Sequence, residues 1–227
     1  SLFVGSYGRG TATADSDLDV LLSLPRSEYE RYDMYKRNGQ SRLLQAVKTA
    51  VSETYSTTDV KGDGQVVVVR FSDGMKFELL PAFKRADSWG SFMGYDYPDA
   101  HMGGRWLATN PKAEQEAMKE EDTSSRGLLF DTCKHIRNVH AQSFSSYRLS
   151  GIVIDSFVFS AIGGWHWSDE VGTTPAGTYE TQLLDEFNRR SAYGMAPFAL
   201  LSPGSQQPID TTESYECLGK VLRQMAC

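Results

Sequence analysis

The chain has 227 residues, 40% of them hydrophobic, enough for one large domain or two closely packed lobes with a real core. Its 23 basic residues are outnumbered by 29 acidic ones, and the net charge of −6 argues against a broad surface for long nucleic acid. The three cysteines and four histidines lack zinc-ligand spacing and indicate no disulfide framework. No long apolar run and no signal-peptide pattern occurs, which predicts a cytoplasmic protein without membrane contact.

The first part of the chain predicts a lobe of strands with one helix. After Ser41, apolar residues recur at helical spacing on one face. Pro25 and Pro81 are expected to end the strands that precede them. The order strand, strand, helix, strand, strand predicts a compact α/β lobe with a mixed sheet. Four stretches have the apolar or β-branched character of strands, the last two joined by a turn: 1–7, 18–24, 66–71 and 75–80.

The second part of the chain is expected to be mainly helical. Residues 82–111 are dense in aromatic residues, Gly and Pro without a clean period, which predicts an irregular segment between two lobes. The predicted division gives a catalytic lobe over 1–97 and a mainly helical lobe over 98–227. Helical periodicity beyond Pro111 predicts five helices: 112–121, 127–141, 150–162, 179–190 and 211–225.

Two carboxylates project together from the start of the second strand. Asp17 and Asp19 are two residues apart, and side chains at that spacing share one side of a strand. Adjacent carboxylates repel each other unless a cation lies between them, and magnesium prefers such hard oxygen ligands together with substrate phosphates. The alternative is a solvated acidic turn formed by Asp15, Asp17 and Asp19, which is what an isolated Asp-x-Asp usually means.

Glu78 is a charged residue inside an otherwise apolar strand. A buried carboxylate needs a partner, and a third carboxylate in the same lobe would complete a cluster able to hold two metal ions. The alternative is an edge-strand glutamate paired with Lys76 or Arg70.

Gly5-Ser6 ends the first strand on a residue without a side chain. Backbone N–H groups and a hydroxyl can approach phosphate oxygens closely at such a turn. Arg9 either contacts phosphate or is an ordinary loop residue. Tyr7 either stacks on a base or packs under the loop.

These motifs together resemble the signature of the DNA polymerase beta superfamily and, more narrowly, the bacterial CD-NTases, the SMODS-domain relatives of cyclic GMP-AMP synthase. The resemblance covers nearly the whole chain and implies an α/β (α+β) fold, in which a polymerase-beta-like nucleotidyltransferase lobe with a mixed sheet packs on a mainly helical lobe. Three segments carry it, in the expected order and spacing: Gly5-Ser6-Tyr7-Gly8-Arg9-Gly10-Thr11, Ser16-Asp17-Leu18-Asp19-Val20 and Phe77-Glu78-Leu79-Leu80-Pro81-Ala82.

The resemblance assigns site residues to this chain. It implies that Asp17, Asp19 and Glu78 are catalytic and bind two Mg²⁺ ions, with Mn²⁺ as an alternative. The nucleoside triphosphate is expected at Gly5 and Ser6, with Tyr7 and Arg9 beside them.

The resemblance also implies phosphate contacts from the helical lobe. Lys134 occupies the place of a phosphate-binding lysine, with Arg137 one turn further on the same face; a solvated helix face is the alternative for both. A serine near the start of the next helix completes this site in the family, and either Ser146 or Ser150 fits, so the register stays open.

A finer resemblance concerns the clade that contains the pyrimidine cyclases of Pycsar anti-phage systems. It implies a 3′,5′-cyclic mononucleotide made from UTP or CTP, which a downstream effector protein would sense. The motifs that carry it are Tyr97-Pro98-Asp99, Gly103-Gly104-Arg105-Trp106, Thr109-Asn110-Pro111 and Ser150-Gly151-Ile152-Val153-Ile154-Asp155.

Three alternatives to a pyrimidine cyclase stay open: a cyclic di- or trinucleotide synthase, a catalytically silent nucleotide-binding module, and transfer of a nucleotide to an antibiotic, tRNA or protein. The long N-terminal helix of the family does not precede Gly5, and the chain begins and ends within structured patterns, so a truncated sequence is expected. The zinc insertion of the animal DNA sensor is missing, which, with the acidic charge, argues against activation by DNA. The histidines are expected to be structural.

Overall fold

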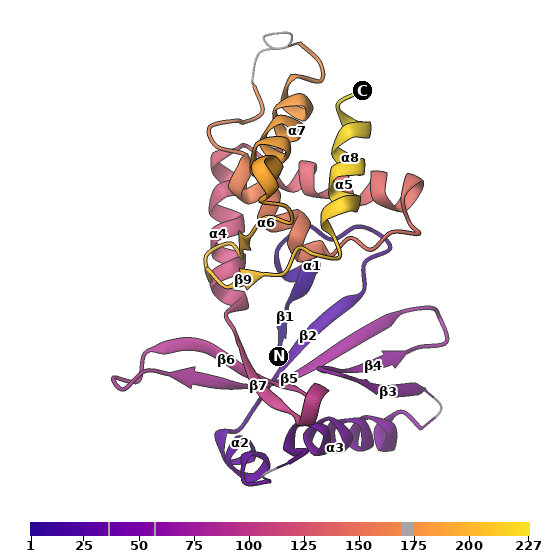
Figure 1. The fold of residues 1–227 in the computed structure, drawn as a ribbon. Helices are drawn as coiled ribbons and strands as arrows, with labels where there is room; N and C mark the ends of the chain where they lie inside the picture. The colour runs from indigo at the N-terminus through magenta and orange to yellow at the C-terminus, as the bar shows by residue number, and fades with distance from the viewer. Residues whose placement is uncertain (36, 57, 169–174) are drawn as a thin grey trace. The chain divides into compact units, whose positions relative to one another are not determined.

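The computed structural model describes residues 1–35, 37–56, 58–168 and 175–227, and the chain forms two compact units (Figure 1). The first unit comprises Ser1–Gly8 and Asp15–Lys112, and the second comprises Arg9–Ala14 and Ala113–Cys227. The short segment Arg9–Ala14 therefore folds with the second unit, although its neighbours on both sides in the chain belong to the first. The sequence placed the division after residue 97, inside a strand that the first unit retains.

The first unit contains a mixed sheet, as predicted, but the sheet has seven strands rather than the predicted four. Five strands follow the order β1-β2-β5-β4-β3, while β6 pairs with β5 and β7 pairs with β6. Only β2 and β5 run parallel; the other described pairs are antiparallel. The strands are β1 (Leu2–Phe3), β2 (Leu18–Leu24), β3 (Asp59–Asp63), β4 (Val66–Arg70), β5 (Lys76–Ala86), β6 (Phe92–Asp99) and β7 (Arg105–Thr109).

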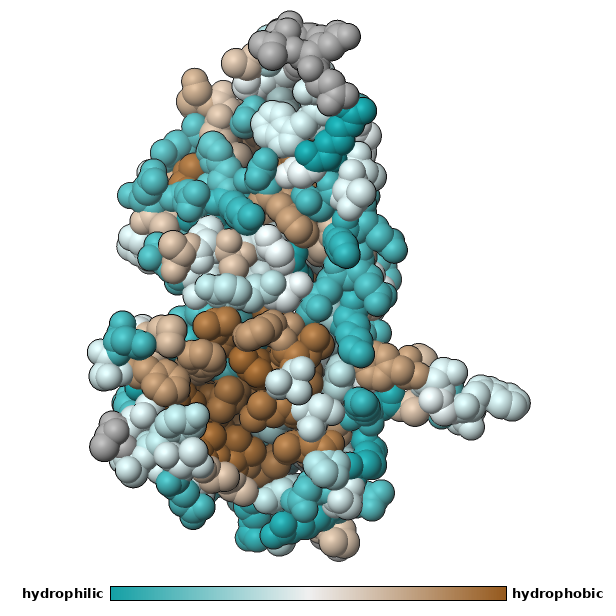
Figure 2. All heavy atoms as spheres, turned by 180° about the vertical axis from the view of Figure 1, so that it is seen from behind, coloured by the Kyte–Doolittle hydropathy of each residue, from teal (hydrophilic) through white to brown (hydrophobic). Residues whose placement is uncertain are grey.

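Two longer helices pack on this sheet, α2 (Arg26–Asp33) and α3 (Gly39–Thr54). Leu44 of α3 packs against valines of β3 and β4, and Leu43 packs with Tyr32 of α2 and Phe83 of β5. The predicted helix after Ser41 is confirmed, because its apolar face is the one that meets the sheet. Figure 2 shows that hydrophobic residues also gather at the surface of the first unit, so these helices leave part of its apolar surface uncovered.

The segment after Gly74 differs most from its prediction. Strand β5 does not stop at Pro81 but continues to Ala86. On the side of β5 opposite β2, β4 pairs up to Leu79 and β6 pairs from Phe83, so Pro81 falls between these two partners, while Leu22 of β2 pairs with it on the other side.

Residues 82–111 are not irregular, because they contain β6, the short 3₁₀ helix η1 (His101–Gly103) and β7. Burial along β6 does not alternate, which removed the usual strand signal. Gly94 lies in β6 with φ +114°, and a Cβ there would lie 2.4 Å from the carbonyl oxygen of Thr109. The close approach of β6 and β7 therefore requires a glycine at this position, although glycine in the sequence usually indicates that a strand is interrupted.

Three further elements of the first unit were not predicted as such. The polar strand β3 buries only Val60, so it lacks an apolar pattern. The helix α2 follows Pro25 directly. The predicted strand 1–7 is only β1, because the turn helix α1 (Gly5–Gly8) begins where Gly5 adopts φ +59°.

The second unit is mainly helical, as predicted, and its core is continuous. Ile136, Phe157, Leu183 and Leu218, from four different helices, are each fully buried. None of the helices in the described part of the chain is long and apolar enough to cross a membrane. The elements are α4 (Pro111–Ser124), α5 (Leu128–Ser143), α6 (Gly151–Ala161), α7 (Thr178–Ser191), the 3₁₀ helix η2 (Ala192–Gly194), β8 (Leu200–Leu201), β9 (Pro208–Ile209) and α8 (Tyr215–Met225).

Candidate active site

Two of the predicted acidic residues face each other across the parallel strand pair of the first unit. The register of β2 and β5 places Asp19 beside Glu78. Paired residues of adjacent strands project to the same side of a sheet, so these carboxylates share one face. Asp17 lies two residues before Asp19, at the entrance to β2. The structure therefore brings the three acids to one region of one unit.

Lys76 provides the positive charge in this region. Its Nζ lies 2.6 Å from Asp17 Oδ2 and 2.7 Å from Glu78 Oε1. Lys76 precedes Glu78 by two residues on β5, so both project from the same face. Burial acts to lower the pKa of Lys76, but its bonds to Asp17 and Glu78 outweigh burial and raise this pKa above its usual value. The pairing of Glu78 with Lys76 was the alternative considered from sequence, and Asp17 shares it.

The donor set suits magnesium, but it is not arranged for metal binding while Lys76 bridges it. Within the described residues, no three His, Cys, Asp or Glu side chains are placed to hold a metal ion together. Carboxylate oxygens are nevertheless the ligands that Mg²⁺ prefers, and Asp17, Asp19 and Glu78 supply them. A metal ion at this place would replace the ammonium of Lys76 as the neutralising charge.

We expect Lys76→Met to lower the stability of the metal-free protein slightly and to increase the stabilisation that Mg²⁺ gives. Loss of the ammonium leaves the carboxylates to repel each other, a cost below about 1 kcal/mol because the groups are partly exposed. Magnesium would then bind without displacing a lysine, so melting temperature should rise further with Mg²⁺ than in the wild type.

Lys61→Met is the matched control, because Lys61 forms an ion pair with Asp59 on β3, apart from the three acids. Thermal melting of both variants across a Mg²⁺ series measures the effect. Equal Mg²⁺-dependent stabilisation in Lys76→Met and wild type would contradict it.

The turn at Gly5-Ser6 lies directly against Asp19. The backbone N–H of Val4 donates to the carbonyl of Asp19 at 2.9 Å, which ties β1 to β2 just before the turn. A Cβ on Gly5 would lie 1.8 Å from Asp19 Oδ2, so no side chain fits there. Ser6 is half-buried, whereas Tyr7 is 41% exposed. The glycine thus allows the proposed phosphate-binding turn to approach a proposed metal ligand.

Arg9, expected beside the nucleotide, is occupied elsewhere. Its Nε donates to Asp155 Oδ2 at 2.8 Å and its Nη1 to Glu114 Oε2 at 3.3 Å, all within the second unit. Only 8% of Arg9 is exposed. Its guanidinium is therefore an internal structural group in this structure and not an exposed phosphate ligand.

Asp155 was not identified from the sequence as a polar centre. A signal was present, because Asp155 interrupts an apolar run in α6 just as Glu78 interrupts one in β5. The same argument, that a buried carboxylate needs a partner, would have found it.

Lys134 and Arg137 differ sharply, although both lie on α5. Lys134 makes no hydrogen bond or ion pair with any residue that the structure describes, which leaves its ammonium available. Arg137 Nη2 donates to the carbonyl of Gly151 at 3.1 Å and also pairs with Asp155, so Arg137 does not lie on a solvated face. A depression of about 300 Å³ contains Lys134 and is lined by Asp131, Lys134, His135, Asn138, Val139 and Gln142.

The two candidate serines occupy different environments in the second unit. Ser146 is exposed in the turn after α5. Ser150 is the N-cap residue of α6, is half-buried, and its backbone N–H donates to Ser214 Oγ at 3.0 Å. Its own hydroxyl makes no capping bond within the described residues. Both serines remain candidates for a phosphate contact.

The motifs of the finer resemblance have structural roles. Asp99 Oδ2 accepts from Arg105 Nε at 2.9 Å, and its other oxygen lies 2.6 Å from His101 Nδ1. Burial alone would raise the pKa of Asp99, but these bonds lower it below its usual value. Trp106 Nε1 donates to Asp33 at 2.9 Å, which ties β7 to α2. These contacts tie the end of β6 to β7 and tie β7 to α2.

Two further histidines also make local structural contacts. His140 bonds to the carbonyl of Tyr147, and His166 to that of Gly164.

Comparison with known proteins identifies a family and a fold. A family model described as the Second Messenger Oligonucleotide or Dinucleotide Synthetase (SMODS) domain matches residues 1–122, more than half of the chain. No curated protein sequence is significantly similar.

Several solved structures share the fold. The Elizabethkingia meningoseptica CdnE cyclic dinucleotide synthase, solved with GTP and Apcpp, has a TM-score of 0.66 at 13% identity, covering 98% of this chain and 82% of its own. A STING-associated CdnE c-di-GMP synthase from Capnocytophaga granulosa has a TM-score of 0.70 at 13% identity, covering 98% and 70%. The Rhodothermus marinus CdnE c-UMP-AMP synthase, with Apcpp and Upnpp, reaches 0.64 at 11% identity, covering 99% and 80%. At these identities the likeness concerns the fold.

Proposed function

Because this chain belongs to the family of Second Messenger Oligonucleotide or Dinucleotide Synthetase domains, we propose that it is a metal-dependent nucleotidyltransferase that makes a cyclic nucleotide and releases pyrophosphate. One observation carries the proposal. Asp19 and Glu78 stand side by side on the parallel strands β2 and β5, with Asp17 joined to Glu78 through Lys76 and with Gly5 packed against Asp19. Three acids around one cation, beside a glycine turn, suit a nucleoside triphosphate with its metal ions.

In the proposed reaction, a ribose 3′-hydroxyl attacks the α-phosphorus in line and loses its proton to solvent, while the bond to the pyrophosphate oxygen breaks. Asp17, Asp19 and Glu78 would hold two Mg²⁺ ions, which supply charge neutralisation and make the hydroxyl more acidic when bound. The Gly5-Ser6 turn would orient the triphosphate, and Lys134 would add positive charge for the departing pyrophosphate. Arg9 has no proposed phosphate contact, because its guanidinium is paired internally.

The product we favour is a 3′,5′-cyclic pyrimidine mononucleotide made from UTP or CTP, a second messenger for an effector protein in anti-phage defence. The motifs between Tyr97 and Asp155 support this choice. A cyclic di- or oligonucleotide is the second candidate. The description of the family and the products in the names of the CdnE relatives favour it.

Incubation of the protein with each nucleoside triphosphate alone, and with all four together, tests the proposal. With Mg²⁺ we expect UTP or CTP alone to give a cyclic mononucleotide and one pyrophosphate, identified by mass spectrometry. A linked di- or oligonucleotide as the main product would replace the pyrimidine cyclase with the second candidate. Absence of any product and of pyrophosphate under all of these conditions would contradict the proposed activity and favour a silent nucleotide-binding module.

A further inference from the structure

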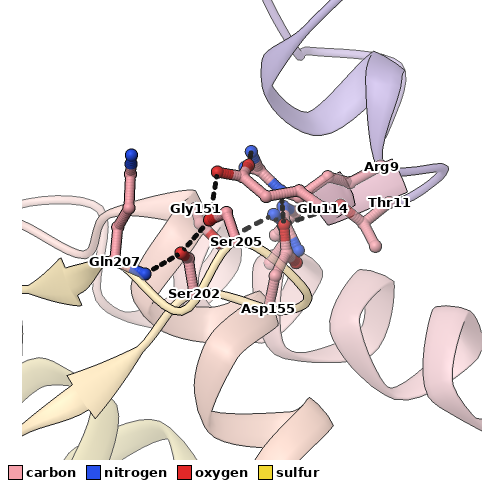
Figure 3. Close-up of polar contacts among 9 residues, drawn as sticks. Arg9, Thr11, Glu114, Gly151, Asp155, Ser202, Ser205 and Gln207 are labelled. Carbon is pink, nitrogen blue, oxygen red and sulfur yellow. Dashed lines mark hydrogen bonds and ion pairs between the residues drawn. The ribbon is translucent and has the colours of Figure 1, made fainter. Parts of the chain in front are cut away.

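A buried polar cluster in the second unit is centred on Asp155 (Figure 3). Asp155 is fully buried, and its Oδ2 accepts from Arg9 Nε at 2.8 Å and from Thr11 Oγ1 at 3.0 Å. Its Oδ1 lies 2.8 Å from Arg137 Nη2, as an ion pair without hydrogen-bond geometry. Arg9 reaches Glu114 with a second nitrogen. Two guanidinium groups therefore face two carboxylates, and the charges balance.

This cluster continues to the loop between β8 and β9. Ser205 Oγ donates to Glu114 Oε1 at 3.3 Å and also bonds to Ser202 Oγ. Ser202 Oγ in turn accepts from the backbone N–H of Gln207 at 3.0 Å. Figure 3 shows these residues converging from α4, α6, the loop before β9 and the segment that carries Arg9 and Thr11. Arg9 is thus held from several directions.

Because the cluster is buried, its stability depends strongly on where each charged group lies. Burial acts to lower the pKa of Arg9, but Asp155 and Glu114 outweigh it and raise this pKa above its usual value. Charges removed from water are tolerated only when their partners are well placed, and loss of one partner leaves the other uncompensated. The cluster therefore fixes where Arg9 and Thr11 lie more than it adds to overall stability.

The held segment is short and joins two parts of the proposed site. Arg9–Ala14 directly follows the Gly5–Gly8 turn and directly precedes Asp15–Asp19. These two flanking stretches belong to the first unit, whereas Arg9–Ala14 belongs to the second. Gly10 has φ +79°, and a Cβ there would lie 2.5 Å from the Phe130 ring, so the segment also packs closely on α5. The residues on either side of this segment are covalently continuous with it, so its conformation bears directly on both of them.

We infer that Asp155 is a positioning residue: through Arg9 and Thr11 it fixes the conformation of the segment Arg9–Ala14, which connects the Gly5-Ser6 turn to Asp17 along the chain. Asp155 itself touches neither substrate nor metal in this scheme. The inference rests on the proposed function, because the turn and the acid matter only if they bind a nucleotide with its metal ions.

Asp155→Asn tests the inference in the full chain. The amide keeps the shape of the carboxylate but removes the charge that Arg9 and Arg137 share. We expect non-hydrolysable UTP, CTP, ATP or GTP, whichever the wild type binds with Mg²⁺, to bind on the order of tenfold to a hundredfold more weakly in calorimetry. Amides of residues 9–14 should also exchange hydrogen faster, while those of α5 stay protected.

Glu186→Gln is the matched control for a lost charge in the second unit. Glu186 pairs with Arg189 and Arg190 on its own helix, α7, and has no bond to residues 9–14. The control should bind the same nucleotide as tightly as the wild type. If Asp155 had only a structural role, Asp155→Asn would lower the melting temperature without a selective effect on nucleotide binding or on amide hydrogen exchange at residues 9–14.

Thr11→Val and Thr11→Ser decide the matter if Asp155→Asn does not fold. Valine removes one donor to Asp155 and leaves Arg9 in place, so binding should weaken by a smaller factor, and serine should restore it. Unchanged binding in a folded Asp155→Asn, or in Thr11→Val, overturns the inference. A wild type that binds none of the four analogues instead overturns the proposed function, which separates the two failures.

Discussion

Asp19→Asn is expected to reduce pyrophosphate release by about a thousandfold or more, which corresponds to roughly 4 kcal/mol of lost transition-state stabilisation. Asparagine has nearly the same shape, so the pairing of β2 with β5 should persist, but a neutral amide is a much weaker ligand for magnesium than a carboxylate. A pyrophosphate-release assay at saturating nucleoside triphosphate and Mg²⁺ measures the loss.

Asp15→Asn is the matched control for this substitution. Asp15 is an exposed acid in the turn just before β2, outside the register that joins β2 to β5. It should keep nearly full activity and the same melting temperature. Comparable activity in Asp19→Asn and wild type would remove Asp19 from the proposed metal site. Equal losses in both variants would point to the total negative charge of this part of the chain instead.

Gly5→Ala is expected to cost on the order of a hundredfold in activity. The new Cβ would lie 1.8 Å from Asp19 Oδ2, a distance that forces either the carboxylate or the turn to move. Gly5 also has φ +59°, where a side chain costs about 1–2 kcal/mol of stability. Initial rates and thermal melting, measured on the same preparation, separate the effect of the displaced carboxylate on activity from the effect of backbone strain on stability.

Gly74→Ala provides the control for backbone strain alone. Gly74 has φ +90° in the turn between β4 and β5, but nothing lies within 4 Å of its Cβ position. This variant should lose a similar amount of stability and keep its activity. If Gly5→Ala loses no more activity than Gly74→Ala, close packing of the turn on Asp19 has no part in the reaction.

The local pattern of the sequence was enough for much of the architecture. Five helices were predicted and found in the second unit, and their apolar side chains meet one common core. In α6 the residues Val153–Val158 are all buried, so length and hydrophobicity rather than spacing indicate this helix. The strands β2 and β4 were likewise visible as apolar runs. Asp17 and Asp19 stood out by their two-residue spacing, Glu78 as a charge inside an apolar strand, and Gly5 as a glycine at the end of a strand. Their catalytic roles stay a prediction.

Strands β6 and β7 could not be identified from the local pattern. Gly94 and Pro98 look like breakers, but Gly94 permits close approach to the neighbouring strand and Pro98 pairs with Trp106 of β7. Whether such a segment forms a strand depends on the strand with which it pairs, and that partner lies elsewhere in the chain.

The sequence by itself predicted which residues could do chemistry: three acids and a glycine turn, indicated by their residue types and spacing, and a lysine on α5, indicated by the family resemblance. Only the tertiary structure decided what surrounds them. It placed Lys76 between Asp17 and Glu78, and it paired Arg9 with Asp155, which lies far along the chain. The reason is that a buried charged side chain pairs with the opposite charge that the fold brings close to it. The two partners lie far apart in the sequence, so the local pattern around either one does not reveal the other.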